Sequence, residues 1–432
     1  MGKKVSIISL GCAKNLVDSE NILALLGEDK FVITDSYKES DIVIINTCAF
    51  IKDAVDESIR VIKKIAEKKN RKKIIVCGCL VQRFKEKIFK IADIDGAIGT
   101  GDPGKVFELV KTLKDNKKIL LVDDKTFVTS KTYPRLITTF PYAYLKISEG
   151  CNNKCNYCLI PYLRGNQRSR KIKDILKEAD DLSKSEIKEI VIIAQDTTNY
   201  GTDLRYGTNL KELLVEITKY DFKWVRIMYC NPARITGDLI EEISKNEKIC
   251  KYLDIPLQHS HPEIIKKMGR PVINYNKIIE NIRKGIKEVR LRTTFMIGFP
   301  GEKEVHFKHL VNFIKENKFD RCGFFKYSRE KGTSSFDFDQ QIDEEIKDKR
   351  LEKVVKIQER ISKNKLKNMV GKTYDVLIEK KDGQFYIGRT EYDAPEVDGV
   401  VFVSGKNLKL GNFYKVKITS SSAYDISGEV II

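Results

Sequence analysis

Three cysteines lie close together in the segment EGCNNKCNYCLIP, residues 149–161. Three residues separate Cys151 from Cys155, and two separate Cys155 from Cys158. A zinc knuckle or a ferredoxin-type cluster normally takes a fourth ligand, but here an apolar Leu-Ile-Pro run follows. Three thiolates can hold three irons of a four-iron cube and leave the fourth iron open to a substrate, as catalytic zinc keeps one position open. The spacing therefore predicts a catalytic iron–sulfur site.

A second set of three cysteines lies in the first part of the chain. Cys12, Cys48 and Cys79 closely follow the apolar runs VSIISL, DIVIIN and KKIIVCG. Because the carboxyl ends of parallel strands share one rim of a sheet, these thiols can converge there. Cys77 competes with Cys79, but Cys77 falls inside the predicted strand, whereas Cys79 follows Gly78 into a loop. We interpret Cys79 as the ligand and Cys77 as a small buried hydrophobe.

Several other residues could contribute to chemistry or to structure. Cys230, Cys250 and Cys322 are scattered, and we interpret them as core residues. His259 in PLQHSH follows a strand and could line a pocket, although a structural role is the better interpretation. The arginines of the RGNQRSR run, residues 164–170, could pair with carboxylates of a cofactor or substrate, or could form a solvated basic loop.

The elements that position these residues fall into three segments. Residues 1–135 alternate apolar runs with amphipathic helical spacing, which predicts a doubly wound parallel α/β domain. Residues 136–368 repeat a strand–helix unit six times, which predicts a partial (βα)6 barrel with its functional groups at the carboxyl ends of the strands. Residues 369–432 contain five short strands divided by turns, which predicts a small antiparallel β-barrel. The fold class is therefore α/β.

Composition limits the kinds of partner. The 432 residues include ten cysteines and are 41% hydrophobic, which argues for a packed core and against global disorder. No apolar run approaches the roughly 18 residues of a membrane span, and the start lacks a secretory leader, so we expect a cytoplasmic protein without disulfides. The net charge of +18 favours anionic partners such as RNA. From Gly371 onward, however, eight basic residues face nine acidic ones.

The two cysteine sets, the partial barrel and the terminal barrel together resemble the radical S-adenosylmethionine methylthiotransferase family over essentially the full chain. The resemblance implies that each set holds a [4Fe–4S] cluster with one open iron. The set of Cys151, Cys155 and Cys158 would bind S-adenosylmethionine, and the set of Cys12, Cys48 and Cys79 would be auxiliary. It also implies a TRAM-like terminal barrel that binds substrate. The cofactor contacts it implies are Tyr157 against the adenine, Gln195 and Asp196 at the end of the second barrel strand, and Gly298 and Glu302 after the fifth.

Four motifs indicate a branch of this family. SLGCAKNLVDSE, NTCAFIKDAVDESI, GCLVQRF and RTEYDAPEVDG resemble the branch that modifies an aspartate of small-subunit ribosomal protein twelve. Ala13 and Cys77 depart from that branch's pattern. The alternatives are a methylthiotransferase acting on a tRNA adenosine and, more distantly, an iron–sulfur electron carrier or RNA-binding protein. The near-neutral tail and its acidic loop, EYDAPEVDG, favour a basic ribosomal protein over RNA.

The resemblance also implies a reaction sequence. One S-adenosylmethionine methylates a sulfur on the auxiliary cluster, and a second yields a 5′-deoxyadenosyl radical. This radical removes a hydrogen from the β-carbon of the aspartate, which then captures the methylthio group. A flavodoxin or ferredoxin is the implied electron donor. The substrate could be free or assembled in the ribosome, where contact with ribosomal RNA is also open.

Overall fold

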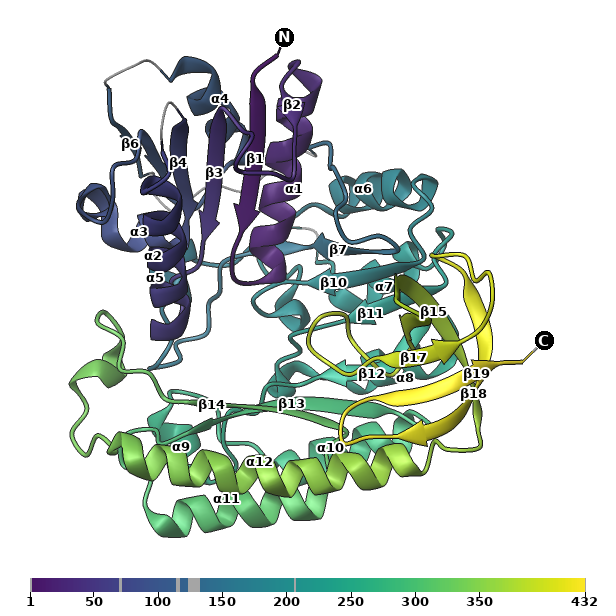
Figure 1. Ribbon diagram of the computed structural model, residues 1–432. Helices are drawn as coiled ribbons and strands as arrows, with labels where there is room; N and C mark the ends of the chain where they lie inside the picture. The colour runs from purple at the N-terminus through teal and green to yellow at the C-terminus, as the bar shows by residue number, and fades with distance from the viewer. Residues whose placement is uncertain (1, 70–71, 114–116, 123–132, 206, 432) are drawn as a thin grey trace.

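The computed structural model describes residues 2–69, 72–113, 117–122, 133–205 and 207–431. Met1 and residues 123–132, which belong to the first predicted segment, and Ile432 of the last lie outside the described residues. The chain forms two open parallel sheets and one closed barrel (Figure 1). The predicted α/β fold class, with its doubly wound domain, partial barrel and terminal barrel, is confirmed.

The first sheet has six strands in the order β2-β1-β3-β4-β5-β6, and every pairing is parallel. Its strands are β1 (Lys4–Ser9), β2 (Val32–Ile33), β3 (Ile42–Thr47), β4 (Lys73–Gly78), β5 (Gly96–Ile98) and β6 (Ile119–Leu121). The strand order reverses between β1 and β3, which is where doubly wound sheets bind their ligands.

Helices cover both faces of this sheet. Helices α1 (Ala13–Glu28) and α4 (Pro103–Thr112) pack on one face, and α2 (Lys52–Ala66) and α3 (Cys79–Phe84) on the other. A short 3-10 helix, η1 (Lys85–Lys90), follows α3. Because both faces are covered, β3 is buried along its whole length, in keeping with its continuous apolar sequence.

The second sheet forms the partial barrel, in the order β14-β13-β12-β11-β10-β7 with parallel pairings throughout. Its strands are β7 (Tyr142–Lys146), β10 (Glu189–Ile193), β11 (Trp224–Ile227), β12 (Ile249–Asp254), β13 (Arg290–Ile297) and β14 (Arg321–Lys326). Each coincides with one of the six predicted strand runs. A two-stranded ribbon of β8 (Ser148–Glu149) and β9 (Arg168–Ser169) brackets the cysteine loop and the short helix α5 (Ile160–Arg164).

The outer helices of the barrel are α6 (Ile172–Lys184), α7 (Leu210–Ile217), α8 (Gly237–Lys245), α9 (Pro262–Lys267), α10 (Tyr275–Gly285), α11 (Glu304–Asn317) and α12 (Glu344–Lys367), with the short helices η2 (Thr197–Asn199), η3 (Pro232–Arg234) and η4 (Ser334–Asp337). A large apolar core lies between the strands and these helices. The long helix α12 runs beside α11 and leads to the last segment (Figure 1).

The last segment closes into a five-stranded barrel, in the order β15-β16-β17-β19-β18. Its strands are β15 (Thr373–Asp382), β16 (Phe385–Arg389), β17 (Val401–Ser404), β18 (Phe413–Ser421) and β19 (Ile426–Val430). The pairing of β17 with β19 is parallel, so the barrel is not antiparallel throughout, as the sequence alone suggested. Closure leaves no free sheet edge.

The terminal barrel packs on the concave side of the partial barrel. The buried carboxylate of Glu189 on β10 accepts hydrogen bonds from Arg226 on β11 and Arg389 on β16, each at 2.6 Å. Nearby, the rings of Trp224 and Phe413 meet edge to face with centroids 4.7 Å apart. Ion pairs and apolar contacts therefore join the two barrels.

The acidic loop EYDAPEVDG contributes to this junction. The carboxylates of Asp393 and Asp398 form ion pairs with Arg321 and Arg292 of the partial barrel, and that of Glu396 accepts hydrogen bonds from two tyrosine hydroxyls. These internal bonds explain the acidic residues without a partner, so complementarity between the loop and a basic ribosomal protein stays a prediction. In the described parts of the chain, no helix combines the length and the low polarity needed to cross a bilayer.

Candidate functional site

The first cysteine set lies on the carboxyl-end rim of the first sheet. Cys12 is the N-cap of α1 after β1, Cys48 follows β3, and Cys79 is the first residue of α3 after β4. These three strands are neighbours in the sheet, so the thiols converge as predicted. Gly11 has a φ of +91°, and a Cβ there would lie 2.5 Å from the Cβ of Cys48. Only glycine therefore allows this close approach.

The electrostatics agree with three neighbouring thiols. The pKa of Cys48 is raised to about 12, chiefly by burial and in smaller part by the nearby Cys79 and Cys12. Burial also raises the pKa of Cys79, an effect that the nearby Arg164 opposes. The thiols of Cys12 and Cys79 both disfavour ionisation of Cys48, and a donor set of this kind suits a positively charged metal centre.

Cys77 differs from Cys79 in its surroundings. It lies inside β4, is 3% exposed and belongs to the apolar core shared with α1 and α4. Burial raises the pKa of its thiol, with smaller contributions from Asp18 and Cys79. Cys79 does not enter a loop, as the sequence suggested, but begins α3. The placement supports our choice of Cys79, although its role as a ligand stays a prediction.

The second set lies at the carboxyl end of the first barrel strand. The backbone N–H and the side-chain amide of Asn153 both donate to the sulfur of Cys151, at 3.4 and 3.3 Å, and the N–H of Ile160 donates to Cys158 at 3.4 Å. The pKa of Cys158 is raised to about 12, chiefly by burial and in smaller part by Cys155 and Cys151. Hydrogen bonds to two of the three sulfurs favour their thiolate forms.

The apolar run that replaces a fourth ligand has a structural purpose. Leu159 and Leu163 are 1% and 0% exposed, and both lie in the apolar core of the first sheet. Helix α5 therefore anchors the cysteine loop of the barrel to the first domain. This contact brings the two cysteine sets toward each other.

The spacing of the sulfurs is compatible with a cluster of several irons. A tetrahedral zinc site with bonds of about 2.3 Å places its sulfurs roughly 4 Å apart. Among the described residues, only His261, Glu263 and His306 form a group of three whose ligand atoms all lie within 4.8 Å of one another. In each cysteine set, at least one pair of sulfurs is therefore more than 4.8 Å apart.

The histidine group is explained by helix capping. His261 accepts a hydrogen bond at Nδ1 from the N–H of Glu263, and His306 accepts one at Nδ1 from the N–H of Lys303. His259, which is fully buried, accepts at Nδ1 from the N–H of His261. A metal-bound histidine instead donates from its second ring nitrogen. These contacts support the structural interpretation of His259.

Asp196, a predicted cofactor contact, lies beside the barrel cysteines. It follows β10 and is 2% exposed. Its Oδ2 accepts hydrogen bonds from Asn153 at 2.8 Å, Arg234 at 2.8 Å and Asn231 at 3.2 Å. Because Asn153 also donates to Cys151, the carboxylate is linked to the cluster loop through one side chain.

Gln195 and Tyr157 are two further predicted cofactor contacts. The amide nitrogen of Gln195 donates to Glu149 at 2.8 Å, while its buried Oε1 has no hydrogen-bond partner within the described residues. A buried acceptor of this kind is costly unless a ligand supplies a donor, so it fits a cofactor with hydroxyl or amino groups. The Tyr157 ring packs edge to face with Phe299, and its hydroxyl is 3.5 Å from the guanidinium of Arg270.

Gly298 and Glu302 have partners of their own. Gly298 has a φ of +75°, and a Cβ there would lie 2.3 Å from the side chain of Lys347. The fully buried carboxylate of Glu302 accepts from the N–H of Gly298 at 3.0 Å and from Arg350 at 2.7 Å. Contact of either residue with a cofactor stays a prediction, because these interactions account for both within the protein.

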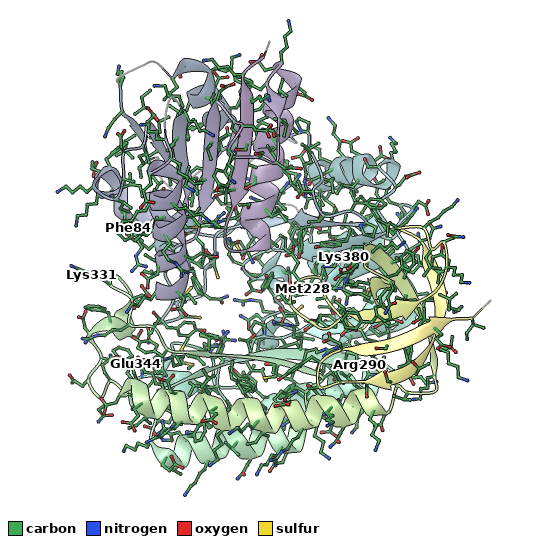
Figure 2. All side chains as sticks on the ribbon, in the orientation of Figure 1. Phe84, Met228, Arg290, Lys331, Glu344 and Lys380 are labelled. Carbon is green, nitrogen blue, oxygen red and sulfur yellow. The ribbon has the colours of Figure 1, made fainter. Side chains whose placement is uncertain are left out.

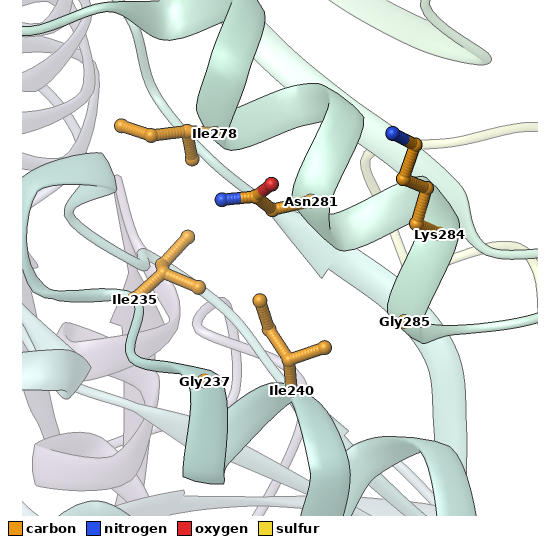
Figure 3. A pocket seen from close by; sticks show the side chains of 7 residues that line it. All are labelled: Ile235, Gly237, Ile240, Ile278, Asn281, Lys284 and Gly285. Atoms are coloured by element: carbon orange, nitrogen blue, oxygen red, sulfur yellow. The ribbon is translucent and has the colours of Figure 1, made fainter.

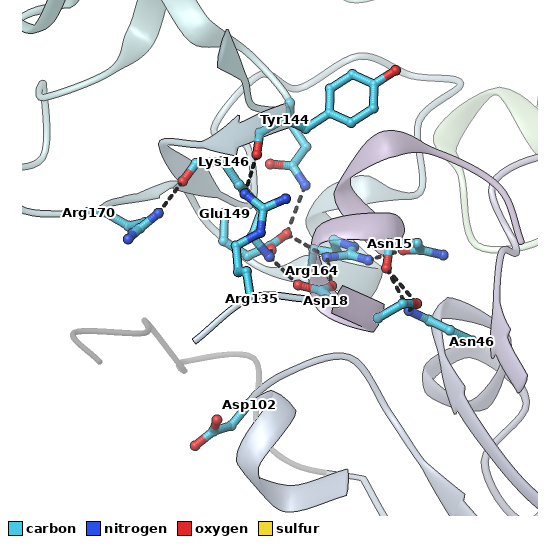
Figure 4. A network of polar contacts seen from close by, with 12 residues as sticks. Asn15, Asp18, Asn46, Asp102, Arg135, Tyr144, Lys146, Glu149, Arg164 and Arg170 are labelled. Carbon is cyan, nitrogen blue, oxygen red and sulfur yellow. Dashed lines mark hydrogen bonds and ion pairs between the residues drawn. The ribbon is translucent and has the colours of Figure 1, made fainter. Parts of the chain in front are cut away.

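A buried polar network joins the two cysteine sets, and sequence reasoning missed it (Figure 4). Arg164, whose side chain is 4% exposed, donates to Glu149 at 2.9 Å and to Asn15 on α1 at 2.5 Å, and forms an ion pair with Asp18 at 3.5 Å. Lys146 on β7 contacts the carboxylates of Asp18 and Glu149. Burial would raise the pKa of Glu149, but Arg164 and Lys146 hold it far below its ordinary value.

The arginines of residues 164–170 therefore do not form a solvated loop. Arg170 is also buried and donates to Glu178 at 2.6 Å. Arg164 and Arg170 pair with the protein's own carboxylates, so the predicted pairing with carboxylates of a cofactor or substrate is wrong for these two. In the sequence, the Asp-Ser-Glu end of the motif SLGCAKNLVDSE could have indicated this network, because it places Asp18 six residues after Cys12.

The cavity in Figure 3 lies away from both cysteine sets. It measures about 420 Å³ and is lined by residues of α8, α10 and their flanking loops, including Ile240, Asn281 and Lys284. In Figure 2, Met228, which follows β11, lies near the centre of the view, whereas Lys331 and Glu344 lie toward one side. The candidate site lies where the first sheet meets the partial barrel, because the network around Arg164 joins the two.

The chain matches three known families. Residues 4–99 match a family described as Uncharacterized protein family UPF0004, residues 145–314 match the Radical SAM superfamily, and residues 370–431 match the TRAM domain. Among solved structures, the radical S-adenosylmethionine methyltransferase TsrM from Kitasatospora setae superposes with a TM-score of 0.56 at 13% identity, covering 76% of this chain and 75% of that one. At this identity the likeness concerns the fold alone.

Curated relatives match over the full length. The chain is 47% identical to the ribosomal protein uS12 methylthiotransferase RimO of Thermoanaerobacter sp. (strain X514), covering 99% of this chain and 100% of the relative. It is 45% identical to the protein of the same name from Clostridioides difficile (strain 630), covering 99% of each. The chain therefore belongs to the RimO family of methylthiotransferases, enzymes of the radical SAM superfamily.

Proposed function

We propose that this enzyme attaches a methylthio group to the β-carbon of an aspartate in ribosomal protein uS12, using S-adenosylmethionine and two [4Fe–4S] clusters. The relatives' name supports the substrate. The observation that supports the chemistry most is that two cysteine sets, on the rims of two different sheets, are joined by one buried network around Arg164. Two clusters held this way could act on one substrate carbon.

We assign Cys151, Cys155 and Cys158 to the cluster that binds S-adenosylmethionine, as expected of a radical SAM enzyme. We assign Cys12, Cys48 and Cys79 to the auxiliary cluster. The donor sets fit this assignment, because each has three neighbouring thiols of which at least one pair is more than 4.8 Å apart, as a cluster larger than a single ion allows. When bound, these groups supply the one-electron chemistry that removes a hydrogen atom from a carbon with no acidic proton or leaving group.

The protein's own residues orient the reactants and exclude water. Asn153 donates to Cys151 and Asp196 at once, and so fixes the cluster loop relative to the end of β10. The unpartnered Oε1 of Gln195 is available to accept from S-adenosylmethionine, and the Tyr157 ring offers a face for its adenine. Leu159 and Leu163 pack into the apolar core of the first domain and so exclude water where the barrel contacts that domain.

We propose the three segments 1–135, 136–368 and 369–432 as the functional units: auxiliary-cluster domain, partial barrel and substrate-binding TRAM domain. The electron donor is a flavodoxin or ferredoxin, since the one-electron step needs a low-potential donor. The excess of basic residues outside the last segment supports contact with ribosomal RNA during docking. A ribosomal-protein substrate agrees with the cytoplasmic location expected from the sequence.

Mass spectrometry of a deletion strain tests the proposal. We expect tryptic peptides of uS12 to lose one methylthio group, located on a single aspartate, while methylthioadenosine in tRNA is unchanged. Complementation with this chain should restore the mark on uS12. Loss of a tRNA modification with uS12 unaffected would refute the proposed substrate and identify a tRNA adenosine instead.

A further inference from the structure

Lys14 is a buried cation for which the described residues supply no counter-ion. It lies in the first turn of α1, two residues after Cys12, and is 7% exposed. Its ammonium lies over the ring of Tyr229, 3.5 Å from the centroid. Within the described residues, its Nζ forms no hydrogen bond and no ion pair. The other buried cations of this region are paired, since Lys146 and Arg164 both contact Asp18 and Glu149.

The carboxylates near Lys14 form ion pairs with other cations. Asp18 lies four residues further along α1, where an ion pair with Lys14 would be natural, but it pairs with Lys146 and Arg164 instead. Asp254, which accepts from the N–H of Tyr229, pairs with Arg292 at 3.1 Å. An ammonium removed from water without a counter-ion is costly, and a cation–π contact with a tyrosine offsets only part of that cost.

Tyr229 is held in place for this contact. It follows β11 with a φ of +61°, a conformation that non-glycine residues rarely adopt. Its N–H donates to Asp254 at 3.0 Å, and its carbonyl accepts from the N–H of Thr197, the residue after Asp196. The backbone of the barrel rim thus fixes the ring beneath the ammonium.

The position of Lys14 lies between the two cysteine sets. Lys14 comes from the rim that carries Cys12, and Tyr229 comes from the carboxyl end of β11, one strand from Asp196. An anionic group that entered between the first sheet and the partial barrel would therefore meet an unneutralised ammonium. A carboxylate there gains a charge-assisted hydrogen bond and relieves the cost of the buried cation.

We propose that Lys14 binds the side-chain carboxylate of the substrate aspartate, an inference that rests on the proposed function. The carboxylate carbon is bonded directly to the β-carbon, so holding the carboxylate fixes the position of the reacting carbon to within one bond. Lys14 then selects aspartate over asparagine, because a neutral amide leaves the ammonium without a counter-ion.

The test measures kcat/KM with uS12 and with uS12 carrying asparagine in place of the target aspartate. The wild-type enzyme should prefer aspartate by about 10- to 100-fold, the value of one hydrogen bond to a charged group. Lys14→Met should lower kcat/KM for aspartate by a similar factor, mainly through KM, and abolish the preference. Lys14→Arg should retain part of the preference for aspartate over asparagine.

Lys52→Met is the matched control, because Lys52 is an exposed lysine that begins α2 four residues after Cys48. It should keep the wild-type preference. Iron content verifies that each variant holds its clusters. If Lys14→Met fails to fold, the wild-type preference still decides, since a preference near one overturns the inference. An unchanged preference in Lys14→Met also overturns it. Failure of the wild-type enzyme to modify uS12 at all refutes the proposed function, and this inference with it.

Discussion

Replacing Arg164 with methionine should release the auxiliary cluster selectively. Arg164 is the cation that Glu149, Asp18 and Cys79 share. Methionine keeps an unbranched stem, shorter than that of arginine, and carries no charge, so the variant leaves two partly buried carboxylates with Lys146 as their remaining cation. Removing one partner of a buried ion pair costs about 3–5 kcal/mol.

Lys146 compensates for one of the two carboxylates, so we expect the lower end of that range, about 3 kcal/mol. This corresponds to roughly a hundredfold change in an equilibrium constant. Partners of metal ligands that act from outside the ligand shell have effects of the same size, about 10- to 100-fold in metal affinity. Both estimates, the cost of the broken ion pair and the effect on metal affinity, predict the same result. Arg164→Met should lose the iron of the auxiliary cluster at chelator concentrations that the wild-type protein tolerates.

The assay counts iron per chain after anaerobic chelator challenge, together with 5′-deoxyadenosine and methylthiolated product. Arg164→Met should retain about half of the iron and should produce 5′-deoxyadenosine without methylthiolated product. Arg170→Met is the matched control, because Arg170 is equally buried in the same loop but pairs with Glu178. It should lose stability yet keep both clusters. Equal iron loss in the two variants would refute our reasoning, since the effect would then be general destabilisation.

Three further predictions concern the cysteines. Cys151→Ala should abolish cleavage of S-adenosylmethionine, whereas Cys12→Ala should spare cleavage and block methylthiolation; normal product from Cys12→Ala would disprove the auxiliary site. Iron counting should show that Cys79→Ala loses the auxiliary iron and Cys77→Ala keeps it, and the reverse result would mean that we chose the wrong cysteine. Because burial raises the pKa of Cys48 to about 12, its thiol keeps its proton at pH 7 and iron must displace it. Iron bound by apoprotein in a fixed time should therefore increase from pH 7 to pH 9, and a decrease would contradict this.

The fold was largely predictable because its signals are local. Each of the six strands of the partial barrel coincides with an apolar run, and the cysteines follow strands within a few residues. Parallel topology then requires the carboxyl ends of neighbouring strands to share a rim. What could not be predicted was the parallel pairing of β17 with β19, since strand propensity does not specify a partner.

The sequence by itself determined which residues could bind metal, which architecture would present them, and which family they belong to, since all three depend on spacing along the chain. Only the tertiary structure decided how charges are used. The contact between Asn15 and Arg164 spans 149 residues, and a charged residue looks the same in a sequence whether it is solvated or buried. Hence the acidic loop, which looked available to a partner, is bonded within the molecule, and Lys14, which nothing in the sequence sets apart from the other lysines, is buried with no counter-ion among the described residues.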